Sequence, residues 1–308
     1  VEITGFGFTG LRLRYCENQT LPSLRVRNCG YAGVAGLSCL DVHVSSLLVR
    51  NIAPGVSQDA YGIFADRDEN GTLITDPPSE RCSAFVNIAG VRAGGNGQGV
   101  NSHGGRDIRF EGEVNDCDVM GAFTSSNVGG SATLGPKRCF ARLTGKSDAQ
   151  GYGFFIAGAT SGGSVVDYAE DCHVNLNMTG YGKEIADGSI GGLLLRGTKG
   201  TRVRGTYKNN RNAGVVLEGA NIALDIDATF IDPYSDAFGA PSCVRVIGSD
   251  NRGKIAGTFR YENGGLLTNV AVNAVRVEGS LSGLDIDIAP SSFVGIFDGR
   301  LALTILSS

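Results

Sequence analysis

The sequence contains no tryptophan, few charged residues and no long apolar run. Charged residues make up 19% of the chain, below the roughly 25% that is usual in soluble domains. The net charge of −4 argues against a nucleic-acid partner, which requires a basic surface. Because no stretch of about 18 apolar residues occurs, we expect no membrane insertion. Zinc, phosphate-loop and nucleophile-elbow motifs are also missing from the sequence, so we expect no resident metal.

The eight cysteines form no CxxC pair, which argues against a zinc site. Four of them share one position, immediately before an alternating strand: Cys39, Cys82, Cys139 and Cys172. We predict small, buried, apolar thiols stacked at one corner of a repeat. The alternative is a set of disulfides in a secreted protein.

Glycine is abundant, with 47 residues, and it flanks a short repeated strand. The repeat consists of a small residue, an alternation of apolar and variable positions, and often a second glycine. Its clearest copies begin at Gly62, Gly99, Gly121, Gly153, Gly192, Gly214, Cys243 and Ala274. The first apolar positions lie 22 to 39 residues apart, as in Val100 to Ala122 and Phe154 to Leu193. A minimal coil therefore needs about 22 residues, and longer coils carry inserted loops.

Second strands with a period of two lie between the copies, as in 174–178 and 224–228. Asn- and Gly-rich turns separate them, and these residues suit corners that need positive φ. We predict an all-β fold, a single right-handed parallel β-helix of roughly ten coils with inserted loops. We expect it to occupy residues 1–308 as one domain, excised from a longer chain. A β-sandwich, the main alternative, does not predict one strand repeated in the same register.

Alignment of the copies predicts which side chains are neighbours, because strands of adjacent coils lie about 4.8 Å apart. The first and third positions are apolar and face inward, so the second and fourth face outward. The fourth position predicts a column of Asp66, His103, Ser125, Ala157, Arg196, Glu218, Ile247 and Glu278. The second position predicts a column of Phe64, Asn101, Phe123, Phe155, Leu194, Val216, Arg245 and Arg276.

Asp66 and His103 are the candidate catalytic pair, with Asn101 and Ser125 beside them. A carboxylate next to an imidazole orients the ring, which is a common way to build a general acid or base. The alternative is a surface ion pair without catalytic function. The Gly104–Gly105 pair that follows is expected to let a polymer approach the backbone closely.

Phe64, Phe123 and Phe155 are predicted to form an exposed aromatic strip, with Tyr61 and Tyr152 nearby. Aromatic rings cover the flat C–H faces of sugars, so the strip predicts a carbohydrate-binding surface. The alternative is that inserted loops at 67–97 and 126–150, or a neighbouring subunit, cover these rings.

The pattern of Gly-flanked strands and Asn corners resembles the pectin-lyase-like right-handed β-helix superfamily, over roughly residues 5–290. That superfamily includes pectate lyases, alginate epimerases and bacteriophage tailspikes. The string at 101–108 is similar to the site strand of alginate epimerases, with His103 at the family's His and Asn101 in place of its Asp. The repeat is a signature of the fold and not of the function.

The resemblance implies a polysaccharide partner, a homotrimer, and a location on the virion tail or outside the cell. We expect a tailspike-like depolymerase, acting as a polysaccharide lyase or glycosidase. In elimination from a uronate, His103 would move the proton and Arg67 or Arg106 would neutralise the carboxylate. Hydrolysis needs two carboxylates, and Asp66 with Asp107 or Asp148 are the candidates. The alternatives are a non-catalytic fibre or adhesin and a uronan epimerase.

The segment Asp66–Gly71 begins like a calcium loop, D-x-D-x-N-G. Its twelfth position is Pro77, where such a loop requires a bidentate Glu. We therefore expect no cofactor here, with calcium as the alternative.

Overall fold

The computed structural model describes residues 1–53, 59–66, 77–128, 131–148, 152–182, 191–233, 241–261, 273–278, 285–295 and 303–306. Within these ranges the regular secondary structure consists of strands, which confirms the all-β prediction. The described residues include no helix that is long and apolar enough to cross a membrane.

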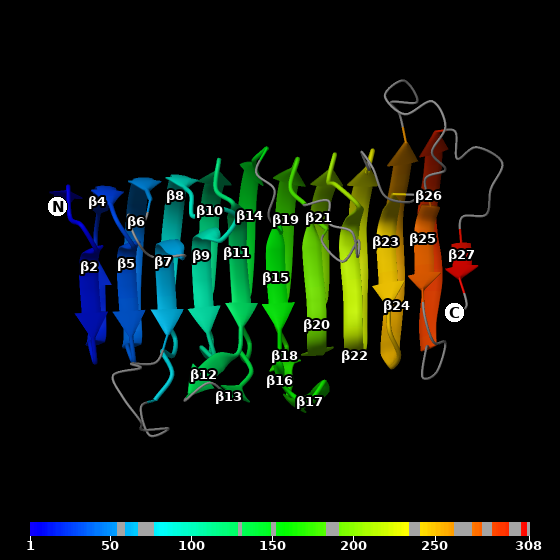
Figure 1. Cartoon of the computed structure of the whole chain (residues 1–308), viewed down its shortest axis with the longest axis horizontal. Helices are drawn as coiled ribbons and strands as arrows, with labels where there is room; N and C mark the ends of the chain where they lie inside the picture. The colour runs from blue at the N-terminus through cyan, green and yellow to red at the C-terminus, as the bar shows by residue number, and fades with distance from the viewer. Residues whose placement is uncertain are drawn as a thin grey trace.

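The strands stack coil upon coil along one long axis, with the two termini at opposite ends (Figure 1). Face A is made of parallel strands paired in this order: β2 (Thr9–Arg14), β5 (Ala32–Leu37), β7 (Ala60–Asp66), β9 (Gly97–His103), β11 (Val119–Thr124), β15 (Phe154–Ala157), β20 (Leu193–Lys199), the first part of β22 (Ala213–Ile231), β23 (Ser242–Ile247), β25 (Asn273–Glu278) and β27 (Leu303–Leu306).

Face B is a second parallel stack: β1 (Glu2–Thr4), β4 (Leu24–Cys29), β6 (Leu40–Ile52), β8 (Ser83–Val91), β10 (Arg109–Asn115), β14 (Phe140–Lys146), β19 (His173–Thr179), β21 (Arg202–Lys208), the later part of β22, β24 (Asn251–Tyr261) and β26 (Asp285–Gly295). Short β3 (Glu17–Leu21) pairs with β6, and β18 (Ala169–Glu170) pairs with β20. The chain is therefore a parallel β-helix, as predicted.

Two antiparallel hairpins extend from the end of face A where its strands finish (Figure 1). One pairs β12 (Ser126–Val128) with β13 (Ser131–Leu134), and the other pairs β16 (Ala159–Ser161) with β17 (Ser164–Asp167). Strand β13 contacts both strands of the second hairpin, so the hairpins lie against each other.

The core lies between the faces and contains stacked aromatic side chains. Phe110 and Phe123 stack with ring centroids 6.2 Å apart, and Phe123 meets Phe154 edge-on at 5.3 Å. Further along the axis, Phe230 stacks on Tyr207 and on Phe259. All of these rings are buried, and they pack between successive coils.

One corner of the helix holds a column of residues with positive φ: Asp41, Arg81, Asp107, Arg138 and Asp171, all between +51° and +53°. Their charges alternate along the axis. Arg81 bonds both carboxylate oxygens of Asp41, and Arg138 does the same with Asp107. Repulsion between like charges in neighbouring coils is thereby avoided.

The cysteine corner lies beside this column. Cys39, Cys82, Cys139 and Cys172 are buried, and all eight cysteines of the chain are free thiols. The prediction that these four thiols are buried is confirmed, and no disulfide forms among the eight cysteines, all of which lie within the described residues. The predicted single stack is wrong: Cys139 aligns with Cys172, whereas Cys82 aligns with Val42 and Ile108 and Cys39 lies three residues before that position. The turns also include an amide pair between neighbouring coils, in which Asn51 Nδ2 donates to Asn28 Oδ1 at 3.3 Å.

The predicted register is correct except at one copy of the repeat. Gly121, not Ala122, aligns with Val100 and Phe154, so Phe123 aligns with Ser102 and faces the core. The expectation that Phe123 is exposed is therefore wrong, since its exposed fraction is 0%. A shift of one residue moves every following side chain to the other face of a strand.

Candidate functional site

The candidate site follows the column at the end of the face A strands. The observed column contains Asp66, His103, Thr124, Ala157, Arg196, Glu218, Ile247 and Glu278. Thr124 takes the position that was predicted for Ser125, which follows it and is half-buried. The other members stand where the alignment predicted them.

Asp66 and His103 are in direct contact, as the register predicted. Nδ1 of His103 lies 2.8 Å from Oδ2 of Asp66. The Asp66 side chain is 7% exposed, whereas the His103 side chain is 26% exposed. The carboxylate is therefore held inside while one side of the imidazole meets solvent. This arrangement orients the ring, as general acid–base catalysis requires.

An aromatic cluster lies next to the pair on the outer side of face A. Tyr61 meets the His103 ring edge-on at 6.3 Å and also contacts Phe64. The Tyr31 ring packs edge-on against the rings of Tyr61 and Phe64. It also stacks on Phe8, with ring centroids 4.7 Å apart. Phe64 is only 8% exposed, whereas Phe8 is 61% exposed. Phe64 therefore lies inside the cluster, and Phe8 is its exposed outer ring. The sequence pattern did not indicate Phe8.

The other predicted members of the aromatic strip separate. Phe155 and Tyr152 stack at 5.7 Å, and both are half-buried. The guanidinium of Arg196 lies 5.9 Å from the Phe155 ring. With Phe123 in the core, the predicted continuous strip is replaced by two separate aromatic groups on the outside of face A.

Asn101 and its neighbours are more buried than expected. The amide Nδ2 of Asn101 donates to Oε1 of Gln98, and Asn101 is 1% exposed. Gly104 and Gly105 are buried, with Ser126 packed against Gly104 and Ser102 against Gly105. The glycine pair therefore turns the chain inside the fold and offers no open approach for a polymer, contrary to expectation.

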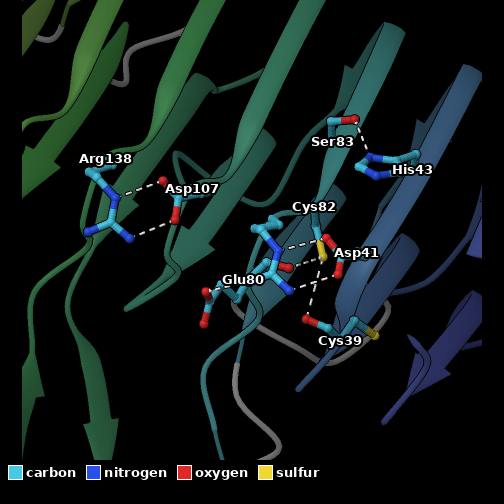
Figure 2. A network of polar contacts seen from close by, with 9 residues as sticks. Cys39, Asp41, His43, Glu80, Cys82, Ser83, Asp107 and Arg138 are labelled. Carbon is cyan, nitrogen blue, oxygen red and sulfur yellow. Dashed lines mark hydrogen bonds and ion pairs between the residues drawn. The ribbon is translucent and has the colours of Figure 1, made fainter. Parts of the chain in front are cut away.

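Asp107 and Arg106 lie in the corner between β9 and β10. The carboxylate of Asp107 is bound at both oxygens by Arg138, at 2.8 and 2.7 Å (Figure 2). Arg106 is exposed, and its backbone bridges Glu80 and Lys137 in the neighbouring coils. Asp107 thus belongs to the alternating charge column. Asp148 is 95% exposed and pairs with Arg92 at 3.4 Å.

Among the described residues, no group of three or more potential ligands for a metal ion occurs. Arg67 and the rest of the possible calcium loop, residues 67–76, lie outside the described residues.

A groove of about 680 Å³ opens in the same column, beyond the second hairpin. Arg196 and Glu218 lie in it, and Nη2 of Arg196 donates to Oε2 of Glu218 at 2.5 Å. The sequence predicted that Arg196 and Glu218 are neighbours in the column, but it did not predict the groove. One wall of the groove is the β16–β17 hairpin. The position of this hairpin depends on tertiary packing, which the local sequence of 159–167 does not predict.

Comparison with protein families, with curated proteins and with solved structures finds no significant match to this chain.

Proposed function

We propose that this protein binds and depolymerises a bacterial surface polysaccharide, in the manner of phage tailspike β-helices. The single observation that carries the proposal is the Asp66–His103 contact, in which a nearly buried carboxylate holds a partly exposed imidazole. The pair lies beside an aromatic cluster that ends in the exposed ring of Phe8. Aromatic rings next to an acid–base group are the combination that a sugar polymer requires.

His103 is the group that moves the proton in this proposal. Its Nδ1 faces Asp66, so exchange with a substrate uses Nε2. In β-elimination, the neutral ring takes the proton from the carbon next to a uronate carboxyl. The electrons of that C–H bond form a C=C bond, the C–O bond to the leaving sugar breaks, and the departing oxygen takes the proton back from the imidazolium. Asp66 stabilises the imidazolium that forms.

Elimination is favoured over hydrolysis by the position of Asp107. Hydrolysis requires two carboxylates at the scissile bond. Asp107 is bound by Arg138 at both oxygens and is committed to the corner column. A lyase is therefore the preferred reaction class, and a glycosidase is the second.

A non-catalytic glycan-binding fibre or adhesin is the alternative function. It requires the aromatic cluster beside His103 but not the acid–base pair itself. A uronan epimerase would change sugar stereochemistry without shortening the chain. Product analysis separates all three functions.

The test compares two histidine variants on polysaccharides that the unmodified protein shortens. His103→Gln removes the proposed acid–base group. His43→Gln is the matched control, because His43 is also a strand histidine with Nδ1 in a hydrogen bond, 2.9 Å from Oγ of Ser83 (Figure 2). We expect the first variant to lose about 100-fold or more in rate, and the second to cleave normally. Normal cleavage by His103→Gln would sink the assignment.

A further inference from the structure

We propose that the groove beyond the second hairpin is a separate binding site for an uncharged oligosaccharide segment. The inference does not depend on catalysis by Asp66 and His103. The groove volume of about 680 Å³ is in the range of small-molecule sites. One wall is the β16–β17 hairpin with Val165, followed by Tyr168, and the floor is formed by β20, β22 and β23.

The floor is formed by three glycines in successive coils. Gly197, Gly219 and Gly248 follow Arg196, Glu218 and Ile247 in register, and all three have positive φ. The ends of this row are two coils apart, or about 10 Å. Because glycine has no side chain, a flat ligand can approach the backbone closely at Gly219 and Gly248, whereas at Gly197 the Val165 side chain already occupies this space.

Buried amides hold this floor in position from below. Asn221 Nδ2 donates to Oδ1 of Asn251 at 2.8 Å and to the Gly219 carbonyl at 3.3 Å. Asn251 Nδ2 in turn donates to the Gly248 carbonyl at 3.3 Å. Both asparagines are 0% exposed. The site is therefore preorganised, which lowers the entropic cost of binding.

The groups around the floor match the chemistry of a sugar. Carboxylates of Glu218 and Asp250 accept hydrogen bonds from hydroxyls, and the guanidinium of Arg196 donates them. Val165 and the Tyr168 ring offer apolar surface to C–H faces.

The charges among the lining residues select the class of sugar. They comprise one cation, Arg196, which Glu218 already neutralises, and the additional anion Asp250. A polyuronate would meet net negative charge here. The groove therefore favours uncharged sugars over uronates, unlike the substrate proposed for His103.

The groove and the Asp66–His103 pair lie on one line. Arg196 is three coils beyond His103 in the same column, or about 14 Å along the axis. A heteropolysaccharide that runs along the axis would place uncharged sugars in the groove when an acidic sugar reaches His103.

The test measures binding of defined oligosaccharides by calorimetry to the full chain. The uncharged probes are three- to four-sugar fragments of dextran, galactan and chitin, and the charged probes are matching fragments of polygalacturonate and alginate. Gly219→Asn adds a side chain to the floor at a φ of +71° that Asn tolerates. Gly94→Asn is the matched control, at a φ of +63° on a turn outside the groove and with equally open surroundings.

We expect at least one uncharged fragment to bind more tightly than the charged ones. Its affinity should fall about tenfold or more in Gly219→Asn and in Glu218→Gln. It should stay unchanged in Gly94→Asn and in His103→Gln, and the last variant separates this site from the proposed function. The proposal is overturned if no uncharged fragment binds, if uronate fragments bind more tightly, or if both groove variants bind like the unmodified protein.

Discussion

At the scale of single residues, the core phenylalanines and the corner thiols contribute most directly to the stability of the coils. Phe123 connects face A to face B, because it stacks on Phe110 of β10 and meets Phe154 of the next face A strand. Phe85 has the same chemistry on face B but is 60% exposed. The two residues therefore form a matched pair for measuring burial.

We predict that Phe123→Ala lowers the free energy of unfolding by about 3–5 kcal/mol, through lost transfer energy and a cavity. Phe85→Ala should change it by less than about 0.5 kcal/mol. Urea unfolding at one protein concentration measures both values. Similar small effects for the two variants would mean that Phe123 is on the surface, as the repeat alignment alone suggested.

Cys82 makes the stability dependent on alkaline pH. Burial raises the pKa of its thiol to about 11. The thiol donates a hydrogen bond to the Glu80 carbonyl at 3.3 Å. The pKa of Cys82 is higher in the folded than in the unfolded protein. The stabilisation that the buried neutral thiol contributes to the folded state is therefore complete below the unfolded pKa. It is lost as pH rises through the folded pKa.

We predict that the unmodified protein loses more stability than Cys82→Ala between pH 8 and about pH 11. Denaturant unfolding of the two proteins across this range gives the difference directly. A difference that does not vary with pH would show that the folded thiol has an ordinary pKa.

At the scale of the element, glycine decides how neighbouring strands pack. In most copies of the repeat a glycine precedes the first inward position, as Gly99 precedes Val100. In β11 the glycine itself takes the inward position, and Met120 stands before it. A Cβ on Gly121 would lie 2.5 Å from Cγ2 of Val100 and 2.8 Å from the Phe154 ring, so side chains of both neighbouring coils occupy the space of the missing side chain.

This exchange explains the one error of register in the predicted columns. The motif begins with glycine in most copies. It cannot show in which copy this glycine itself takes the inward position, with side chains of neighbouring coils filling the space. Elsewhere the alternation was sufficient, and it predicted both the Asp66–His103 contact and the Arg196–Glu218 pair. The hairpins and the groove remained unpredicted because their positions depend on contacts between segments rather than on periodicity.

Gly112 in the middle of β10 is required by the approach of the neighbouring strand. It has a φ of +130°, and a Cβ there would lie 2.0 Å from the carbonyl oxygen of Val86. Gly7 has an ordinary φ and open space around its Cβ position.

We predict that Gly112→Ala lowers the free energy of unfolding by about 1–3 kcal/mol or more, because backbone strain and a steric clash act together. Gly7→Ala should leave it unchanged or raise it slightly, since it restricts only the unfolded chain. Thermal unfolding monitored by circular dichroism compares the two variants. Equal stability for both would show that β8 and β10 do not pack as closely as described.

At the scale of the whole molecule, the parallel β-helix gives a long surface on which sites in different coils share one line. Asp66 and His103 lie on one side of the paired hairpins, and the groove with Arg196 and Glu218 lies on the other. Each coil contributes one residue to the column, and these residues differ in size and charge from coil to coil.

The resemblance to tailspike β-helices leads us to propose a homotrimer. We predict a solution mass about three times the chain mass of 32.0 kDa, measured by light scattering during size-exclusion chromatography. A mass of one chain across micromolar concentrations would contradict the trimer, while leaving the groove and the Asp66–His103 pair intact within one chain.

Whether the protein shortens a polysaccharide is decided by the length of the products. The unmodified protein is incubated with a panel of acidic and neutral bacterial polysaccharides, and chain length is followed by size-exclusion chromatography together with the absorbance of unsaturated uronate. We expect at least one acidic polysaccharide to shorten with a rise in that absorbance. If the protein binds a polysaccharide that keeps its full length throughout, it is not a depolymerase.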